Sequence, residues 1–291
     1  MSISNSLSLA VQTANVEAWS IDGVVVPVTV RLADRFNNPV PDGTAVTFTT
    51  EGGRIGGQCL TTTTASESGV CTVNWVSSEP RPSNGRATIL ATAIGEESFS
   101  DTNGNGAFDA GETFIDEGEP FRDDDEDGSY QFGVESFYDF NNNSTRDSPD
   151  GLFNGVLCRD QARCDVVRTT TGIGKRHVII MSDGTAQITG PASIDLSTTS
   201  PQNVDIIVRD FNGNPMPAGT TVSVDAGNGS VGQPSSYTVP STTAAQNSSV
   251  SGATLFRFRL TKDTTSSDGV LAITVRSPGS ILTYLNIPVH D

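Results

Sequence analysis

The chain has 291 residues, 18% of them charged, and a formal net charge of −17. This length is typical of two domains of ordinary size, and the acidic balance excludes nucleic acid as a partner. No apolar run approaches the roughly 20 residues of a membrane span, and no basic-then-apolar signal peptide opens the chain. Strand-like sequence follows directly after Met1, which indicates a fragment of a longer protein.

Short strands are expected to dominate the structure. The chain contains 29 Gly and 15 Pro, and it is rich in Thr, Ser and Val. This mixture favours short strands joined by tight turns. Because no stretch keeps an apolar period of 3.6 residues, helices should be scarce.

One motif occurs twice, at residues 28–48 and again at residues 204–224. In the first copy Val28, Val30 and Leu32 alternate with polar residues, which is the period of a half-buried strand. An Asn-Pro-x-Pro turn follows, where proline prevents strand pairing. The repeat predicts two homologous domains. The matching positions of the two copies are Asp34, Asn38, Pro39, Pro41, Gly43, Thr44 and Val46 against Asp210, Asn214, Pro215, Pro217, Gly219, Thr220 and Val222.

The motif Asn-Pro-Val-Pro-Asp-Gly-Thr-x-Val-x-Phe at residues 38–48, followed by Gly-Gly, resembles the group 1 bacterial immunoglobulin-like domains of invasin- and intimin-type adhesins. Strand-like segments at 69–75 and 85–93, and at 252–260 and 269–275, resemble the paired late strands of that family. The resemblance implies an all-β fold of two tandem immunoglobulin-like β-sandwiches and a role in cell adhesion. It does not cover an acidic segment inside the first copy.

We expect the first domain at residues 1–182, interrupted by this acidic insertion at about 96–165, with its last strand at about 174–182. The second domain is expected at residues 183–291. Sandwich loops tolerate insertions of this kind.

Four cysteines form two close pairs, Cys59 with Cys71 and Cys158 with Cys164. Neither pair has zinc-site spacing with a nearby histidine, so two disulfides in an oxidising, extracellular or cell-surface location fit better. Close spacing favours the two local bridges. The other connectivities and four free buried thiols remain open alternatives.

The acidic segment contains a sequence that fits a calcium loop. Between Glu96 and Asp150 there are seventeen acidic residues and two basic ones. Calcium prefers six to eight hard oxygen ligands, and a loop with acidic or amide residues at positions 1, 3, 5, 9 and 12 and Gly at position 6 gathers them. The predicted ligands are Asp101, Asn103, Asn105, the carbonyl of Ala107, Asp109 and Glu112.

Two further loops fit the same template less well, so we expect two to three calcium ions. The second has Asp123, Asp125 and Asp127, and its closing acid, Glu135, comes one residue late. The third has Asp139, Asn141, Asn143 and Asp147, with Ser144 in the Gly position and Asp150 as its closing acid. The flanks lack helical sequence, and the third loop resembles thrombospondin-type calcium repeats more than a helical EF-hand.

A pattern Glu-x-Phe-x-Asp at 112–116, 119–123 and 135–139 links the loops and adds Asp116 and Glu119 to the predicted ligands. The Glu, Phe and Asp side chains of the pattern share one face of an extended chain. The Glu is expected to close the preceding loop and the Asp to open the next one, while the Phe packs in a small core. Recurring aromatics argue against a disordered acidic linker. A solvated acidic loop without metal is the alternative.

No enzyme is expected. The carboxylates have metal-loop spacing rather than the arrangement of a glycosidase pair, and His177 and His290 are interpreted as structural. We expect a calcium-stiffened structural stalk or adhesion segment of a larger bacterial surface or secreted protein, whose partners are its neighbouring immunoglobulin-like domains. The alternative is a binding module for a host glycan or protein, acting through the insertion or the sandwich loops.

Overall fold

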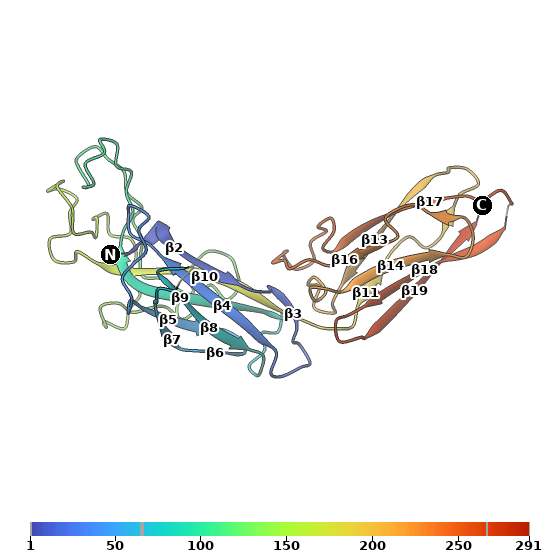
Figure 1. Cartoon of the computed structure of the whole chain (residues 1–291), viewed down its shortest axis with the longest axis horizontal. Coiled ribbons are helices and arrows are strands. Elements are labelled where there is room, and N and C mark those ends of the chain that lie inside the picture. The colour runs from blue at the N-terminus through green and yellow to red at the C-terminus, as the bar shows by residue number, and fades with distance from the viewer. Residues whose placement is uncertain (1, 65–66, 266, 291) are drawn as a thin grey trace. The chain divides into compact units, whose positions relative to one another are not determined.

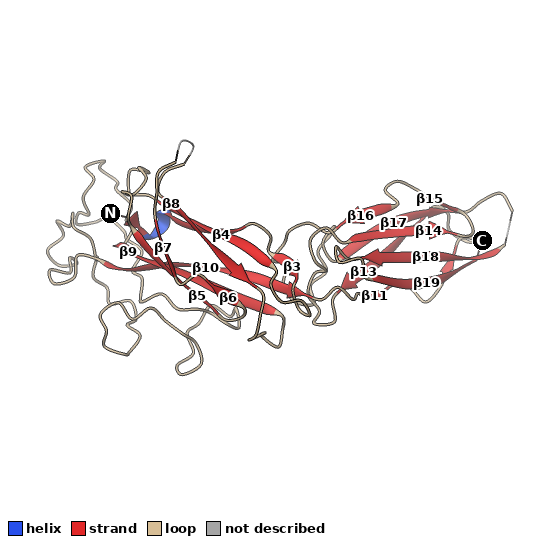
Figure 2. Cartoon of the chain, turned by 60° about the horizontal axis from the view of Figure 1, so that its bottom comes forward, coloured by secondary structure: helices blue, strands red, loops and turns tan. Residues whose placement is uncertain are grey.

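The computed structural model describes residues 2–64, 67–265 and 267–290. The expected all-β class is observed. Within the described residues there is no α-helix, and the one helical element is a 3-10 turn, η1 (Ser4–Ser6). Figure 2 shows the strands, in red, stacked in layers and joined by loops.

The first sandwich consists of two sheets. One has the strand order β2-β4-β8-β6, and the other has the order β3-β10-β9-β5-β7 with β1 added beside β9. The strands are β1 (Ser2–Ile3), β2 (Leu7–Val11), β3 (Asn15–Glu17), β4 (Val25–Leu32), β5 (Ala45–Thr50), β6 (Arg54–Ile55), β7 (Gln58–Leu60), β8 (Val70–Val76), β9 (Arg86–Glu96) and β10 (Thr171–Ser182).

The second sandwich repeats this order. Its sheets run β11-β13-β17-β15 and β12-β19-β18-β14-β16, so β10 holds the place in the first sandwich that β19 holds in the second. The strands are β11 (Gln187–Thr189), β12 (Ile194–Asp195), β13 (Gln202–Arg209), β14 (Thr221–Ala226), β15 (Ser230–Val231), β16 (Ser236–Thr238), β17 (Leu255–Thr261), β18 (Asp268–Arg276) and β19 (Leu282–His290).

The chain forms two compact units. The first contains residues 1–12, 25–76 and 88–177, and the second contains residues 13–24, 77–87 and 178–291. In the second unit the Asn15 side chain donates to the carbonyl oxygen of Met216 at 2.7 Å. Some residues of β3, β9 and β10 therefore belong to the same compact unit as the second sandwich, and the predicted boundary at residue 183 stays a prediction.

The repeated motif forms the same local structure in both sandwiches. In β4, Val28 and Val30 are buried, because alternate strand residues face the space between the sheets. At the turn that follows, the Asp34 carboxylate accepts hydrogen bonds from the backbone N–H groups of Phe36 and Asn38. Asp210 accepts the N–H group of Asn214 at 2.8 Å in the same way. The Asx turn thus redirects each chain after its strand.

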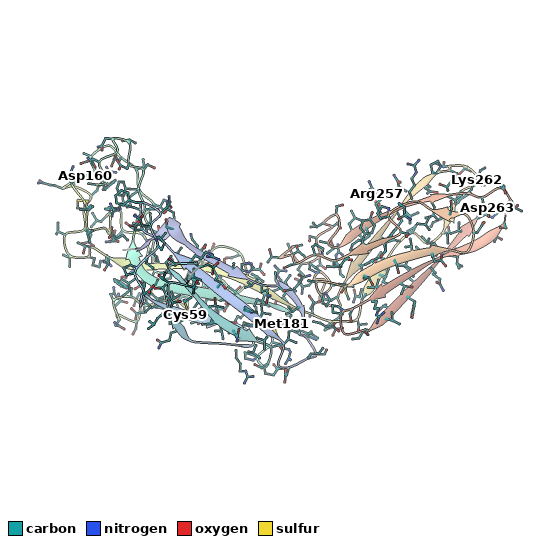
Figure 3. The ribbon with its side chains drawn as sticks, viewed as in Figure 1. Cys59, Asp160, Met181, Arg257, Lys262 and Asp263 are labelled. Atoms are coloured by element: carbon teal, nitrogen blue, oxygen red, sulfur yellow. A yellow bond between two sulfur atoms is a disulfide. The ribbon has the colours of Figure 1, made fainter. Side chains whose placement is uncertain are left out.

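Both predicted disulfides are confirmed. The Cys59–Cys71 bridge joins β7 to β8, which belong to different sheets, so it crosses the first sandwich; Figure 3 labels Cys59. The second bridge joins Cys158 to Cys164 inside the insertion. Trp75 on β8 is fully buried, and its ring nitrogen donates to the carbonyl oxygen of Gly52 at 2.8 Å.

Candidate metal centre in the acidic insertion

The insertion connects β9 to β10 and consists of loops around two short antiparallel pairings. Its chain, green to yellow in Figure 1, gathers beside the N-terminal end of the first unit. Segment 97–101 pairs with segment 112–116 through a bridge between Phe99 and Phe114, and segment 119–123 pairs with segment 135–139 through a bridge between Phe121 and Phe137. We call these the first and second pairs. All four segments read Glu-x-Phe-x-Asp, and the copy at 97–101 was missed in the sequence.

Loop 1 follows segment 97–101 and returns to segment 112–116. The Asp101 carboxylate accepts the N–H group of Gly106 at 2.7 Å. The two oxygens of the Glu112 carboxylate accept the N–H groups of Thr102 at 2.7 Å and of Asp109 at 2.9 Å. The opening Asp and the closing Glu are therefore both fixed on one turn. The remaining predicted ligands, Asn103, Asn105 and Ala107, lie along that turn, and both Asn side chains donate to Asp109.

Loop 2 has the same organisation in the second pair. Asp123 accepts the N–H group of Gly128, and Glu135 accepts those of Asp124 at 2.8 Å and Gln131 at 2.9 Å. The late Glu135 thus lies in the closing position. Ligand oxygens of Asp123, Asp125 and Glu135 all lie within 4.8 Å of one another. Asp127 is exposed, and the side-chain NH2 group of Gln131 donates to Asp127 at 2.9 Å and to Asp125 at 3.2 Å. Gln131 therefore lies beside both carboxylates, and its amide oxygen is a candidate ligand that the sequence interpretation missed.

Loop 3 begins at Asp139 but is closed by Glu119 from the other segment of its pair. The Glu119 carboxylate accepts the N–H groups of Phe140 at 2.7 Å and Asp147 at 3.1 Å. Asp150, predicted as the closing acid, lies elsewhere. Ser144 adopts the left-handed conformation with φ 63° at the position where the other loops have Gly. The predicted Asn141 and Asn143 both donate to Asp147.

A fourth loop is assembled from three separate parts of the chain. The Asp116 carboxylate accepts the N–H groups of Asp150 at 3.2 Å and Gly151 at 2.6 Å. The Glu97 carboxylate accepts the N–H groups of Glu117 at 2.8 Å and Asn154 at 2.9 Å. Sequence templates for continuous loops cannot detect this arrangement. The usable signal was the fourth Glu-x-Phe-x-Asp copy, which would have identified Glu97.

The four loops follow one rule. In each pair, the Asp of one segment opens a loop that the Glu of the other segment closes. The closing side chains are all buried, at 1% exposure for Glu97, 4% for Glu112, 5% for Glu119 and 6% for Glu135. Burial raises the pKa of Glu97 to about 7 against the opposing effect of its backbone hydrogen bonds.

The donor set fits a hard cation. Each loop offers carboxylate, amide and backbone carbonyl oxygens, which is the ligand chemistry of calcium. Within the described part of the chain none of the four closing glutamates forms an ion pair. Arg146 acts electrostatically on Glu119 and Glu135, and Arg176 pairs with Asp123. Buried carboxylates are costly unless charge or hydrogen bonds compensate them, so a cation bound in each loop would favour this arrangement.

Phenylalanine rings form a small core beneath the first pair. Phe108 and Phe153 are fully buried, with ring centroids 4.7 Å apart. Phe99 and Phe114 pack edge-on against Phe153 at 5.4 and 5.7 Å. The Cys158–Cys164 bridge lies beside this core, because Phe108 pairs with Cys158 and Phe153 with Cys164. The predicted packing role of the Phe in the pattern is therefore seen in the first pair.

The sheet order defines an all-β chain of two immunoglobulin-like sandwiches. No protein-family model matches the chain, and no curated protein matches it. Among solved structures it is similar to the adhesin InvE of Yersinia pseudotuberculosis, with 11% identity and a TM-score of 0.29, covering 98% of this chain and 59% of that one. It is also similar to the D0-D1 domain of intimin, with 10% identity, a TM-score of 0.26 and 98% of both chains covered. For the integrin-binding protein invasin the identity is 14% and the TM-score 0.27, and this chain spans 38% of that structure.

At these TM-scores we draw no functional inference from the likenesses. Among the described residues, no helix is long and apolar enough to cross a membrane.

Proposed function

We propose that the chain is a calcium-dependent structural or adhesion segment of a bacterial surface or secreted protein, and that it has no catalytic role. One observation carries this proposal: in each pair of segments, the Glu of one segment closes the loop that the Asp of the other segment opens. A chance acidic loop has no reason to bury four like-charged side chains at equivalent positions.

Four calcium ions, rather than two to three, correspond to these loops. The first would be held by the predicted loop 1 ligands, and the second by Asp123, Asp125, Asp127, Gln131 and Glu135. Glu119 completes the third with Asp139, Asn141, Asn143 and Asp147. The fourth would be held by Glu97, Asp116, Asp150 and Asn154. The hydrogen bonds within each loop support the proximity of its proposed ligand residues.

Calcium is favoured over the other common divalent ions by ligand type. The loops contain no histidine or cysteine ligand, which zinc prefers. Magnesium needs a tight octahedron and gives up water reluctantly, whereas calcium accepts irregular sets of six to eight oxygens. Because such sites gather carboxylates that repel one another, ion binding and folding of the insertion should be coupled.

A stalk or adhesion role is supported by the two repeated sandwiches and by the disulfides, which are typical of exported proteins. Neighbouring immunoglobulin-like domains of the parent protein are the proposed partners. The alternative, a binding module for a glycan or protein, is favoured by one cavity of the first unit that is described below.

Native mass spectrometry of the intact chain tests the calcium proposal. We expect four bound calcium ions, and three after Glu97→Gln, because this substitution removes the closing charge of the fourth loop only. Glu79→Gln is the matched control, since Glu79 is exposed and lies outside the insertion. A chain that binds no calcium at millimolar concentration, or a Glu97→Gln variant that still binds four ions, would contradict the assignment.

A further inference from the structure

A cavity of about 290 Å³ lies in the first unit, between the start of β10 and the first segment of the second pair. Its apolar wall includes Leu90 and Pro120. Three cationic side chains also line it, namely Arg146, Lys175 and Arg176. Glu117 and Glu119 line it as well, so the lining carries three cationic and two acidic side chains, a formal balance of +1 beside an otherwise strongly acidic insertion.

The cations of the cavity are only partly compensated. Arg146 and Arg176 both lie over the Phe121 ring, at 4.8 and 4.5 Å from its centroid. Arg176 pairs with Asp123 at 2.9 Å, and the Nε atom of Arg146 donates to the Glu119 carbonyl oxygen at 2.9 Å. The remaining guanidinium nitrogens of Arg146 and the ammonium group of Lys175 make no hydrogen bond within the described residues. Among these described residues their charges are balanced only through space, by Glu119 and Glu135 for Arg146 and by Glu117 for Lys175.

Arg146 and Arg176 are held side by side over the Phe121 ring, and N–H donors of Arg146 and Lys175 lack hydrogen-bond partners in the part of the chain that the structure describes. This arrangement suits a bound oxyanion. Guanidinium groups bind carboxylate and sulfate oxygens through charge-assisted hydrogen bonds. An acidic peptide fits less well, because it carries several carboxylates, and Glu117 in the same cavity would repel those beside the bound one. A sugar hydroxyl can instead donate to Glu117.

We propose that this cavity binds a single acidic sugar unit, whose carboxylate or sulfate group meets Lys175 and Arg146 while its ring packs on Pro120 and Leu90. The volume is near the lower end for small-molecule sites, which suits one ring. This inference goes beyond the calcium proposal. The two are linked, because Arg146 lies in loop 3 and Glu119 closes that loop, so the shape of the cavity should depend on the ion bound in loop 3.

Amide chemical shifts of the intact, calcium-loaded chain test the proposal, with sodium glucuronate as the probe. We expect saturable shifts at Gly118 and Gly174, which line the cavity, with a Kd on the order of 1 mM for so small a ligand. Glucose, the neutral counterpart, should give none. Lys175→Gln should weaken glucuronate binding about tenfold, the cost of one charge-assisted hydrogen bond, and Lys175→Arg should retain most of it.

The matched control is Lys262→Gln, a charge removal on the second unit at a residue labelled in Figure 3; it should leave binding unchanged. Shifts that do not saturate, equal effects of the two glutamine variants, or tighter binding of inorganic sulfate or of a glutamate peptide than of glucuronate would overturn the proposal. The calcium count of each variant is measured separately. Glucuronate binding without bound calcium would sink the calcium proposal alone, and a full set of ions without glucuronate binding would sink this one alone.

Discussion

The two sandwiches differ most at a single connection. In the second, β18 and β19 are joined by a tight turn in which the Ser277 N–H group donates to the carbonyl oxygen of Ile281 at 2.9 Å. In the first, the equivalent connection between β9 and β10 contains the whole acidic insertion. Loop closure becomes only slowly more costly with length. Adjacent strands can therefore accept a long insertion, provided that the inserted segment can hold itself together.

The two regions hold together by different means. The second sandwich has a continuous apolar core that includes Phe256, Phe258 and Leu260, all fully buried. The insertion fully buries the side chains of Phe108 and Phe153 and also buries several carboxylates. Its stability should therefore depend on bound cations, whereas that of the second sandwich should not.

Removal of calcium by a chelator should produce the largest difference between the two regions. Carboxylates that lose their cations repel one another in a poorly solvated setting. We expect amide hydrogen exchange to rise across residues 97–170 by more than a hundredfold, on the order of 3 kcal/mol of local stability. Exchange in β17 and β18 should not change. Equal protection of the insertion with and without chelator would show that it is simply a solvated acidic loop.

Loss of the aromatic core should have an effect of comparable size, but confined to one part of the insertion. Phe108→Ala removes a fully buried ring, and large-to-small changes of this type cost about 3–5 kcal/mol. Phe132→Ala is the matched control, because Phe132 is 85% exposed. We expect proteolysis of the calcium-loaded insertion to accelerate in the first variant only. Equal proteolysis rates would mean that the ions alone maintain the insertion.

The sequence predicted the all-β class and both disulfides because these depend on local patterns: strand alternation, turn residues and close cysteine spacing. It also identified most of the acidic positions that the structure gathers. It did not identify Glu97 and Asn154, which reach the fourth loop only through the pairing of distant segments. The acid that closes loop 3 was predicted to be Asp150 for the same reason. In the structure Glu119 closes this loop, although it precedes the loop in the chain.

Removal of the Cys59–Cys71 disulfide, which joins the two sheets, should lower the stability of the first unit moderately. Loop-entropy reasoning assigns about 3 kcal/mol to a bridge of separation 12, as in Cys59–Cys71. Alanine at both positions should lower the unfolding free energy of the first unit by that amount in a urea titration. The Cys158–Cys164 bridge closes a loop of half this separation, so its removal should cost about 0.6 kcal/mol less. A larger loss for the shorter bridge would exclude the loop-entropy account.

The smallest expected difference concerns the two aspartates of the repeated turn. Burial raises the pKa of Asp210 to about 6, despite hydrogen bonds from Asn214, Asp183 and Asn212. In Asp34 burial has the same direction of effect, but the hydrogen bonds from Asn38 and Phe36 outweigh it and lower the pKa.

Because the folded pKa of Asp210 is raised, the folded chain holds this proton more tightly than the unfolded chain. The stability that Asp210 contributes is therefore fully present below the unfolded pKa of about 4 and is lost as the pH rises through about 6. Asp34 behaves in the opposite sense, since its contribution is present above the unfolded pKa and is lost as the pH falls through its lowered folded pKa. Carboxyl carbon shifts should place the two midpoints on opposite sides of 3.8, the ordinary pKa of an aspartate side chain. Asp210→Asn should flatten the stability of the second unit between these pH values, and Asp34→Asn should not. Matching midpoints would show that the two turns differ less in burial than their structures indicate.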